Sequence, residues 1–282
     1  MMELLFEILK AFFLGVVQGI TEWLPVSSTG HMILFDEFVK LNVSEQFKEM
    51  FFVVIQFGSI LAVLILYWNR LFPWAKGKTA EEQKQTWNLW LKIVIAAVPA
   101  AVIGLLFDDL LDQYLYNYVV VAATLILYGI VFIVIERKFR NRAYVVNSAE
   151  EFTPKTALKV GCFQLLSLIP GTSRSGSTII GGMLTGVSRT AAAEFSFFLA
   201  IPVMLGASLL KIVKYIAEFG LTFTGVEILT MIVGTATAFG VSLAAIRFLV
   251  GFVRRHSFES FGWYRIVLGT VVLGYFLLNL SF

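Results

Sequence analysis

Hydrophobic residues form long charge-free runs along the chain, separated by short charged segments. An α-helix rises about 1.5 Å per residue, so about 20 apolar residues cross a bilayer core of roughly 30 Å. Six runs approach that length when their charged ends are allowed to reach the headgroups. They are residues 50–68, 87–107, 113–135, 195–210, 228–246 and 266–282. The pattern therefore predicts six transmembrane helices.

Two further apolar stretches are each interrupted by a single charged residue, Glu22 in the first and Arg174 in the second. The halves are too short to cross a bilayer on their own. They are residues 11–21 with 23–35, and residues 160–173 with 175–188. Pro, Gly and hydroxyl residues gather at both interruptions, and non-helical backbone at membrane depth is tolerated only inside protein or beside a water-filled cavity. We therefore expect two re-entrant helical hairpins whose tips line a polar pocket.

The two halves of the chain resemble each other at an offset of about 145 residues. Pro25-x-Ser27-Ser28 returns as Pro170-x-Thr172-Ser173, Gln18 as Gln164 and Glu49 as Glu194. The basic segments 69–86, 136–159 and 247–256 are expected on the cytoplasmic side by the positive-inside rule, which places the two hairpins on opposite sides of the membrane. The predicted fold is an all-α integral membrane protein. It forms a single domain, residues 1–282, built from inverted-topology repeats of approximately 1–140 and 150–282.

Composition narrows the class of protein further. Of 282 residues, 58% are hydrophobic and 15% are charged, whereas about 25% of an ordinary soluble domain is charged. The composition excludes a soluble enzyme and a disordered chain, and it makes membrane lipids the expected surroundings. A net charge of +3 gives no reason to expect a nucleic-acid partner.

The second interruption has the chemistry of a phosphate site. Backbone N–H groups in a glycine-rich turn before a helix favour an anion, and a planar guanidinium such as that of Arg174 suits phosphate oxygens. Hydroxyl groups add further donors. We therefore expect Arg174 to act in catalysis, and the substrate to contact Gly171, Thr172, Ser173, Ser175 and Gly176.

The first interruption adds groups for proton transfer and nucleophilic attack. Ser27, Ser28 and Thr29 are candidate nucleophiles or phosphate ligands, and His31 is a candidate general acid or base. Glu22 is suited to holding a divalent cation or activating a water. Gln18 lies four residues earlier, so it shares a helix face with Glu22 and becomes a weaker candidate ligand. A purely structural Glu22–Arg174 ion pair is the simplest alternative, but it does not explain the surrounding hydroxyl groups.

At this point the residues resemble a known family. Residues 15–31, GVVQGITEWLPVSSTGH, and residues 170–176, PGTSRSG, resemble the undecaprenyl-diphosphate phosphatase family of the bacitracin-resistance type, and the resemblance extends over essentially the whole chain. The family motifs fall on Glu22, Ser27, Ser28, His31 and Arg174. Family members have either Glu or Gln at the position of Gln18, which leaves its contact with a metal in doubt.

The resemblance implies a multi-pass protein of the bacterial plasma membrane. It implies a hydrolase that removes the terminal phosphate of undecaprenyl diphosphate and returns the lipid carrier to peptidoglycan synthesis, which confers bacitracin resistance. A divalent cation, Mg²⁺ or Ca²⁺, and a site that opens to the outer face are expected with it.

Several alternatives remain open from sequence. Ser28 attacks the terminal phosphorus while His31 manages the proton, or a water held by Glu22 and His31 attacks directly. Inverted repeats with broken helices are also the architecture of secondary transporters, so a polyprenyl-phosphate flippase is the rival function. The oligomeric state is open as well, a homodimer included.

Overall fold

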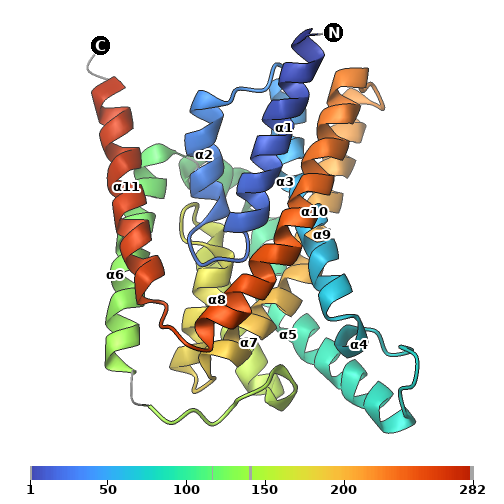
Figure 1. Ribbon diagram of the computed structural model, residues 1–282, viewed down its shortest axis with the longest axis vertical. Helices are drawn as coiled ribbons and strands as arrows, with labels where there is room; N and C mark the ends of the chain where they lie inside the picture. The colour runs from blue at the N-terminus through green and yellow to red at the C-terminus, as the bar shows by residue number, and fades with distance from the viewer. Residues whose placement is uncertain (1, 116, 140–141, 280–282) are drawn as a thin grey trace.

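The computed structural model describes residues 2–115, 117–139 and 142–279, and it is a bundle of helices packed along one axis (Figure 1). The α-helices are α1 (Met2–Thr21), α2 (Ser28–Phe38), α3 (Glu45–Leu66), α4 (Trp68–Leu71), α5 (Ala80–Leu115), α6 (Tyr118–Lys138), α7 (Pro154–Gln164), α8 (Arg174–Leu184), α9 (Arg189–Phe219), α10 (Gly225–Val253) and α11 (Glu259–Asn279), with two short 3₁₀ turns, η1 (Ala149–Glu151) and η2 (Leu165–Leu168). The described parts of the chain contain no β-strand beyond an isolated bridge between Val146 and Val187. The predicted all-α membrane class is confirmed, although residues 280–282 of the last predicted span lie outside the described residues.

Seven of the described helices, rather than the predicted six, are long and apolar enough to cross a membrane. The additional one is α1, which continues back to Met2 through three charged positions, Glu3, Glu7 and Lys10. Glu7 and Lys10 pair at 2.7 Å, and Lys10 also donates to the carbonyl oxygen of Lys40 at 2.7 Å, so these charges do not end the helix. The other spans also reach beyond the charge-free runs, as α11 does by beginning at Glu259.

Local sequence explains where several helices begin. A Ser or Thr side chain accepts a hydrogen bond from a free N–H group in the first turn, which stabilises the helix start. The capping residues are Ser44 for α3, Thr153 for α7, Ser188 for α9 and Thr224 for α10, the last in a capping box with Glu227. These caps follow short loops, so they fix where each helix turns back into the bundle.

The two predicted interruptions are real breaks in the helical structure. Figure 1 shows the α1–α2 connection about midway along the long axis, with both helices extending from it toward the end that holds the N-terminus. Helices α7 and α8 occupy the other half, and their connection meets the α1–α2 connection near the middle. The re-entrant character of these pairs and the inverted relation of the two halves stay predictions.

Glycines allow the two halves to approach closely. A Cβ atom on Gly19 of α1 would lie 2.8 Å from the carbonyl oxygen of Ala238 in α10. A Cβ atom on Gly129 of α6 would lie 2.7 Å from the carbonyl oxygen of Gly262 in α11. Because real Cβ atoms do not approach this closely, both contacts require glycine, and they fix α1 and α11 beside the central connections.

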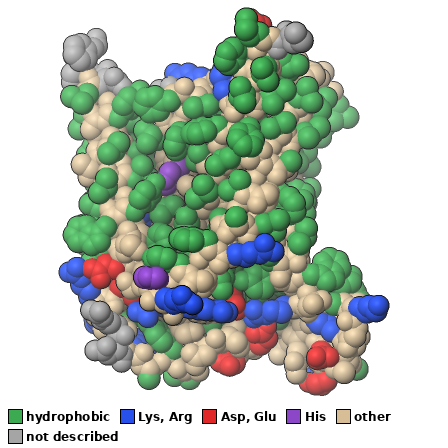
Figure 2. All heavy atoms as spheres, in the orientation of Figure 1, with side chains coloured by type: hydrophobic (Ala, Val, Ile, Leu, Met, Phe, Trp, Pro, Cys, Tyr) green, Lys and Arg blue, Asp and Glu red, His purple; other side chains and the backbone are tan. Residues whose placement is uncertain are grey.

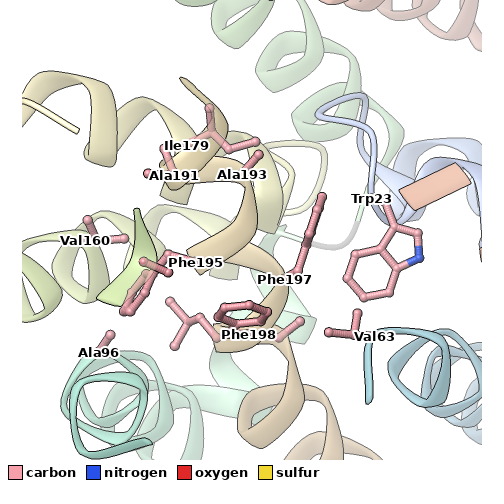
Figure 3. Packing of buried hydrophobic residues seen from close by; sticks show 14 of the residues in the cluster. Trp23, Val63, Ala96, Val160, Ile179, Ala191, Ala193, Phe195, Phe197 and Phe198 are labelled. Carbon is pink, nitrogen blue, oxygen red and sulfur yellow. The ribbon is translucent and has the colours of Figure 1, made fainter. Parts of the chain in front are cut away.

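A buried aromatic cluster supports the α1–α2 turn. Figure 3 shows the side chain of Trp23 directed toward Phe197 of α9, with Val63 and Phe198 close by. The Trp23 and Phe197 rings meet edge to face, with their centroids 5.3 Å apart. Edge-to-face pairs are a favourable arrangement of aromatic rings. This packing holds the turn at Trp23, the residue that follows Glu22 in the chain.

Charged side chains are unevenly distributed over the surface. On the face drawn in Figure 2, hydrophobic side chains cover the middle of the molecule, and Lys, Arg, Asp and Glu side chains gather near its lower end. That end carries α4, the start of α5 and the α10–α11 connection, which belong to the basic segments expected in the cytoplasm (Figure 1). An apolar belt with a charged margin is the surface of a multi-pass membrane protein.

Candidate active site

Two serines form the turns from which α2 and α8 begin. Ser27 and Ser173 have φ values of 71° and 74°, and they are the only described residues other than glycine with positive φ. Each caps its helix, since Ser27 Oγ accepts from the Gly30 N–H at 3.2 Å and Ser173 Oγ accepts from the Gly176 N–H at 3.1 Å. Such strained backbone persists only where its surroundings enforce it, and it is frequent at active sites. Both helix N-termini lie near the middle of the molecule, where their partial positive charge favours an anion (Figure 1).

Glu22 is the centre of a hydrogen-bonded cluster. Its Oε1 pairs with Arg174 Nη2 at 2.9 Å; the Glu22 side chain is buried, and that of Arg174 is 11% exposed. Its Oε2 accepts from Gln18 Nε2 at 2.9 Å and from Ser28 Oγ at 2.9 Å. The structure therefore brings together four of the predicted residues, from α1, the α1–α2 turn, α2 and α8.

Hydrogen bonds to Ser196 of α9 fix the position of Arg174. Its Nη1 donates to the carbonyl oxygen of Ser196 at 2.7 Å and to Ser196 Oγ at 3.2 Å. Its guanidinium lies 5.7 Å from the ring centroid of Trp23. Thr178 Oγ1 donates to Ser196 Oγ at 2.7 Å, which fixes that hydroxyl in turn. Arg174 Nε is buried without a partner, so one donor of this guanidinium is still free. Sequence reasoning gave Ser196 no role in the site.

The predicted substrate-binding residues take several different roles. Ser27 and Ser173 cap helices, and the Gly176 N–H is used by the second cap. Ser175 Oγ contacts the carbonyl oxygens of Glu22 at 3.4 Å and Leu24 at 3.3 Å, so it ties the two turns together.

Three of the predicted substrate-binding residues remain available near the turns. Thr172 Oγ1 is buried and has no partner, which leaves it free to donate. Thr29 lies beside the cluster, on the wall of a cavity. Gly171 has a φ of 85°, which favours glycine, and it brings the backbone of this turn close to α6.

His31 does not join the Glu22 cluster. Its Nδ1 is 2.7 Å from the carbonyl oxygen of Ser27, and its Nε2 is 2.6 Å from the hydroxyl of Tyr264 in α11. The two rings are stacked, with their centroids 5.6 Å apart. The side chain is only 3% exposed, so both nitrogens are occupied inside the protein. Sequence reasoning missed Tyr264, because a partner 233 positions away leaves no local signal.

Arg265 is a second buried cation that the sequence analysis overlooked. It is fully buried, and it donates to the carbonyl oxygen of Pro25 at 3.2 Å and to that of Gly171 at 2.8 Å. Pro25 and Gly171 are 146 positions apart, the same offset that relates Ser27 to Ser173. One guanidinium therefore holds both turns at corresponding carbonyls. A signal existed, because Arg265 directly precedes the last apolar run.

A cavity of about 190 Å³ lies between α1, α2 and α3, next to Gln18. Its polar lining is Gln18, Thr29, Asp36 and Gln56. Gln18 Oε1 is buried without a hydrogen-bond donor, although Gln18 Nε2 bonds to Glu22. The cavity is therefore a partly polar space next to the Glu22 cluster, and the unpartnered Gln18 oxygen lies on its wall.

The oxygen atoms near Glu22 suit a hard cation whose remaining ligands are phosphate oxygens of the substrate. Within the described ranges no group of three or more His, Cys, Asp and Glu side chains is placed to hold a metal ion. Mg²⁺ at phosphate sites is commonly held by one or two carboxylates, with substrate oxygens and water as the other ligands. The Glu22 carboxylate and the unpartnered Gln18 Oε1 fit that pattern.

Comparison with known proteins shows which family the chain belongs to. The family model described as bacitracin resistance protein BacA matches residues 11–271. An undecaprenyl-diphosphatase of Enterococcus faecalis is 56% identical over 269 residues, covering 95% of this chain and 96% of the relative. Undecaprenyl-diphosphatase 1 of Clostridioides difficile (strain 630) is 57% identical over 274 residues, covering 97% of this chain and 98% of the relative. Because both the family model and these relatives span nearly the whole chain, the chain belongs to the bacitracin resistance protein family.

Proposed function

We propose that this protein hydrolyses undecaprenyl diphosphate to undecaprenyl phosphate and inorganic phosphate at the Glu22–Arg174 cluster. The relatives that match almost the full chain at more than half identity carry the name of this activity. One observation carries the proposal: Ser28 and Arg174 each bond to one oxygen of the Glu22 carboxylate. These two residues are the first residues of α2 and α8, so the carboxylate lies beside two helix N-termini. The product is the lipid carrier of peptidoglycan synthesis, and its regeneration opposes bacitracin.

The diphosphate binds where the two helices begin. Phosphoryl transfer depends mostly on positioning and on neutralising charge. Arg174, the free Thr172 hydroxyl and the N-termini of α2 and α8 supply donors of positive character at one place. The isoprenoid tail stays among the apolar helices, which removes the need for a large soluble pocket.

Ser28 is the nucleophile in this mechanism. Its hydroxyl already donates to Glu22 Oε2, so the carboxylate can take its proton. When the diphosphate draws Arg174 to itself, the Glu22 carboxylate is freed from that ion pair and can accept the Ser28 proton. Ser28 Oγ then bonds to the terminal phosphorus, and the bridging P–O bond breaks to release undecaprenyl phosphate. A water attacks the phosphoserine in the second step, and His31 takes the proton of that water.

A divalent cation, Mg²⁺ or Ca²⁺, would be held by Glu22 and Gln18 Oε1 together with substrate oxygens. When bound, it supplies positive charge to the transferring phosphoryl group. Supporting this proposal is the unpartnered Gln18 oxygen at the wall of the neighbouring cavity.

The protein lies in the bacterial plasma membrane with its site open to the outer face. The apolar belt and the basic segments at one end support this orientation, because the cavity beside Gln18 lies in the half that holds the termini (Figure 1). A homodimer stays a prediction.

The test is phosphate release from undecaprenyl diphosphate in detergent micelles, where no sealed compartment exists. Hydrolysis there requires an enzyme, and a flippase alone would give none. Acid quenching of single-turnover reactions followed by peptide mass spectrometry should reveal phosphate on Ser28. Release of phosphate by Ser28→Ala at the wild-type rate would refute the nucleophile and support direct attack by water. Arg137→Ala, which changes an arginine exposed at the surface, serves as the matched control.

A further inference from the structure

The hydrogen bonds of His31 fix the position of its proton. A carbonyl oxygen only accepts hydrogen bonds, so the 2.7 Å contact with the Ser27 carbonyl requires a proton on Nδ1. In the neutral imidazole, Nε2 is then the acceptor. The Tyr264 hydroxyl, 2.6 Å from Nε2, must therefore be the donor.

This arrangement leaves one route for protons. The Nδ1 side ends at a backbone carbonyl, which cannot pass a proton on, and the imidazole is otherwise buried. The phenol of Tyr264 can donate and accept at once. It is 47% exposed, whereas His31 is 3% exposed, so Tyr264 is the accessible member of the pair.

Two neighbours place this pair close to the reaction. Ser28 and His31 are three residues apart at the start of α2, so their side chains share one side of that helix. Arg265 follows Tyr264 in α11 and holds the Pro25 and Gly171 carbonyls. Helix α11 thus carries the phenol at the level of both turns.

We infer that the Tyr264 hydroxyl is the proton relay between His31 and the hydrolytic water. The inference rests on the proposed function, in which His31 takes that proton. In the hydrolytic step the water oxygen bonds to phosphorus while its proton passes to Tyr264 Oη. The original phenol proton moves to His31 Nε2, the phosphorus–Ser28 Oγ bond breaks, and Oγ regains the proton held by Glu22. The imidazolium then returns its proton through the phenol to the released phosphate or to water.

The kinetic test compares Tyr264→Phe, His31→Gln and the double variant, using full-length protein and undecaprenyl diphosphate in micelles. Phe keeps the ring stacked on His31 and removes only the hydroxyl. We expect kcat to fall roughly 10²-fold or more in each single variant, a loss typical of a missing general base, with KM within about twofold. The double variant should be no slower than the singles, because both changes break one relay. Tyr275→Phe on the same helix is the matched control.

A spectroscopic test is independent of activity. The chain has two histidines, so His256→Asn leaves His31 as the sole reporter in ¹⁵N spectra. We expect the tautomer protonated at Nδ1, and a shift of the Nε2 signal in Tyr264→Phe. Observation of the opposite tautomer in otherwise wild-type protein would overturn the inference, even if the tyrosine variant did not fold.

The outcomes separate the inference from the proposed function. Near-normal kcat in Tyr264→Phe with an inactive His31→Gln overturns only the relay. A double variant whose loss equals the product of the single losses also overturns it. Full activity in His31→Gln overturns both the role of His31 and the relay.

Discussion

Ser28 and Arg174 occupy the first position of α2 and of α8, 146 residues apart, and each donates to one oxygen of the Glu22 carboxylate. The preceding residue is in both cases a serine with positive φ. Similar backbone turns therefore present a hydroxyl from one side and a guanidinium from the other. The two halves contribute different chemistry through the same local conformation.

Replacing Arg174 by Lys should lower kcat/KM by about 10²-fold or more. An ammonium group cannot reproduce the planar fork that donates to Ser196 and Glu22 together. Phosphate release measures the effect, and thermal unfolding checks the fold. Arg174→Ala should also destabilise the protein by about 3–5 kcal/mol, because Glu22 is left as an unpaired buried charge. Wild-type kinetics in Arg174→Lys would show that the fork is unnecessary.

The variant Gln18→Glu should lower the concentration of Mg²⁺ or Ca²⁺ needed for half-maximal activity. It adds a second carboxylate beside Glu22, and carboxylates are stronger ligands for hard cations than amides. A chelator should abolish activity in both proteins, and titrating the cation back gives the comparison. Gln56→Glu, at another lining residue of the same cavity, controls for added charge alone. Equal cation requirements in wild type and Gln18→Glu would remove Gln18 from the cation site.

Gly171→Ala should strongly reduce folding yield or activity, whereas Gly77→Ala should be mild. Both glycines have similar positive φ values, 85° and 89°. A Cβ on Gly171 would collide with Thr124 and the backbone of Val121, but a Cβ on Gly77 would meet nothing within 4 Å. The pair thus separates packing from backbone strain, which alone costs about 1–3 kcal/mol. Thermal unfolding of both variants gives the measurement, and equal losses would contradict this account.

Arg265→Met should destabilise the protein and reduce activity together. It keeps an apolar stem of similar length but leaves the Pro25 and Gly171 carbonyls without their shared donor. An unsatisfied buried acceptor costs about 1–3 kcal/mol. Arg265→Lys should recover part of the stability, because it restores one donor. Unfolding midpoints measured beside those of Arg137→Met test the prediction, which unchanged stability would disprove.

Much of the fold and all four residues of the Glu22 cluster could be predicted from local sequence. Glu22 and Arg174 stand out because each is a single charge within an apolar run, and the structure pairs them. Seven helices rather than six are long enough to span a membrane, because charge was treated as a helix boundary in the sequence. Glu7 and Lys10 neutralise each other inside α1. Arg265, which lies inside α11, donates to the carbonyl oxygens of Pro25 and Gly171.

What the sequence could not reveal was which polar groups are already occupied. Ser27, Ser173 and Ser175 look like substrate ligands by composition, yet they cap helices or join the turns. His31 looks like a neighbour of Glu22, but its ring nitrogens bond to Ser27 and Tyr264. Occupancy depends on contacts between distant segments, which spacing along the chain does not encode.

The bonds between the two turns also bear on how the lipid meets the protein. Alternating access would require one half to rock against the other around the midpoint. Here such rocking would have to separate Glu22 from Arg174, detach Ser175 from Leu24 and release both carbonyls held by Arg265. A centre locked in this way favours chemistry in place. We therefore expect the headgroup to enter and leave the site from the same side of the membrane.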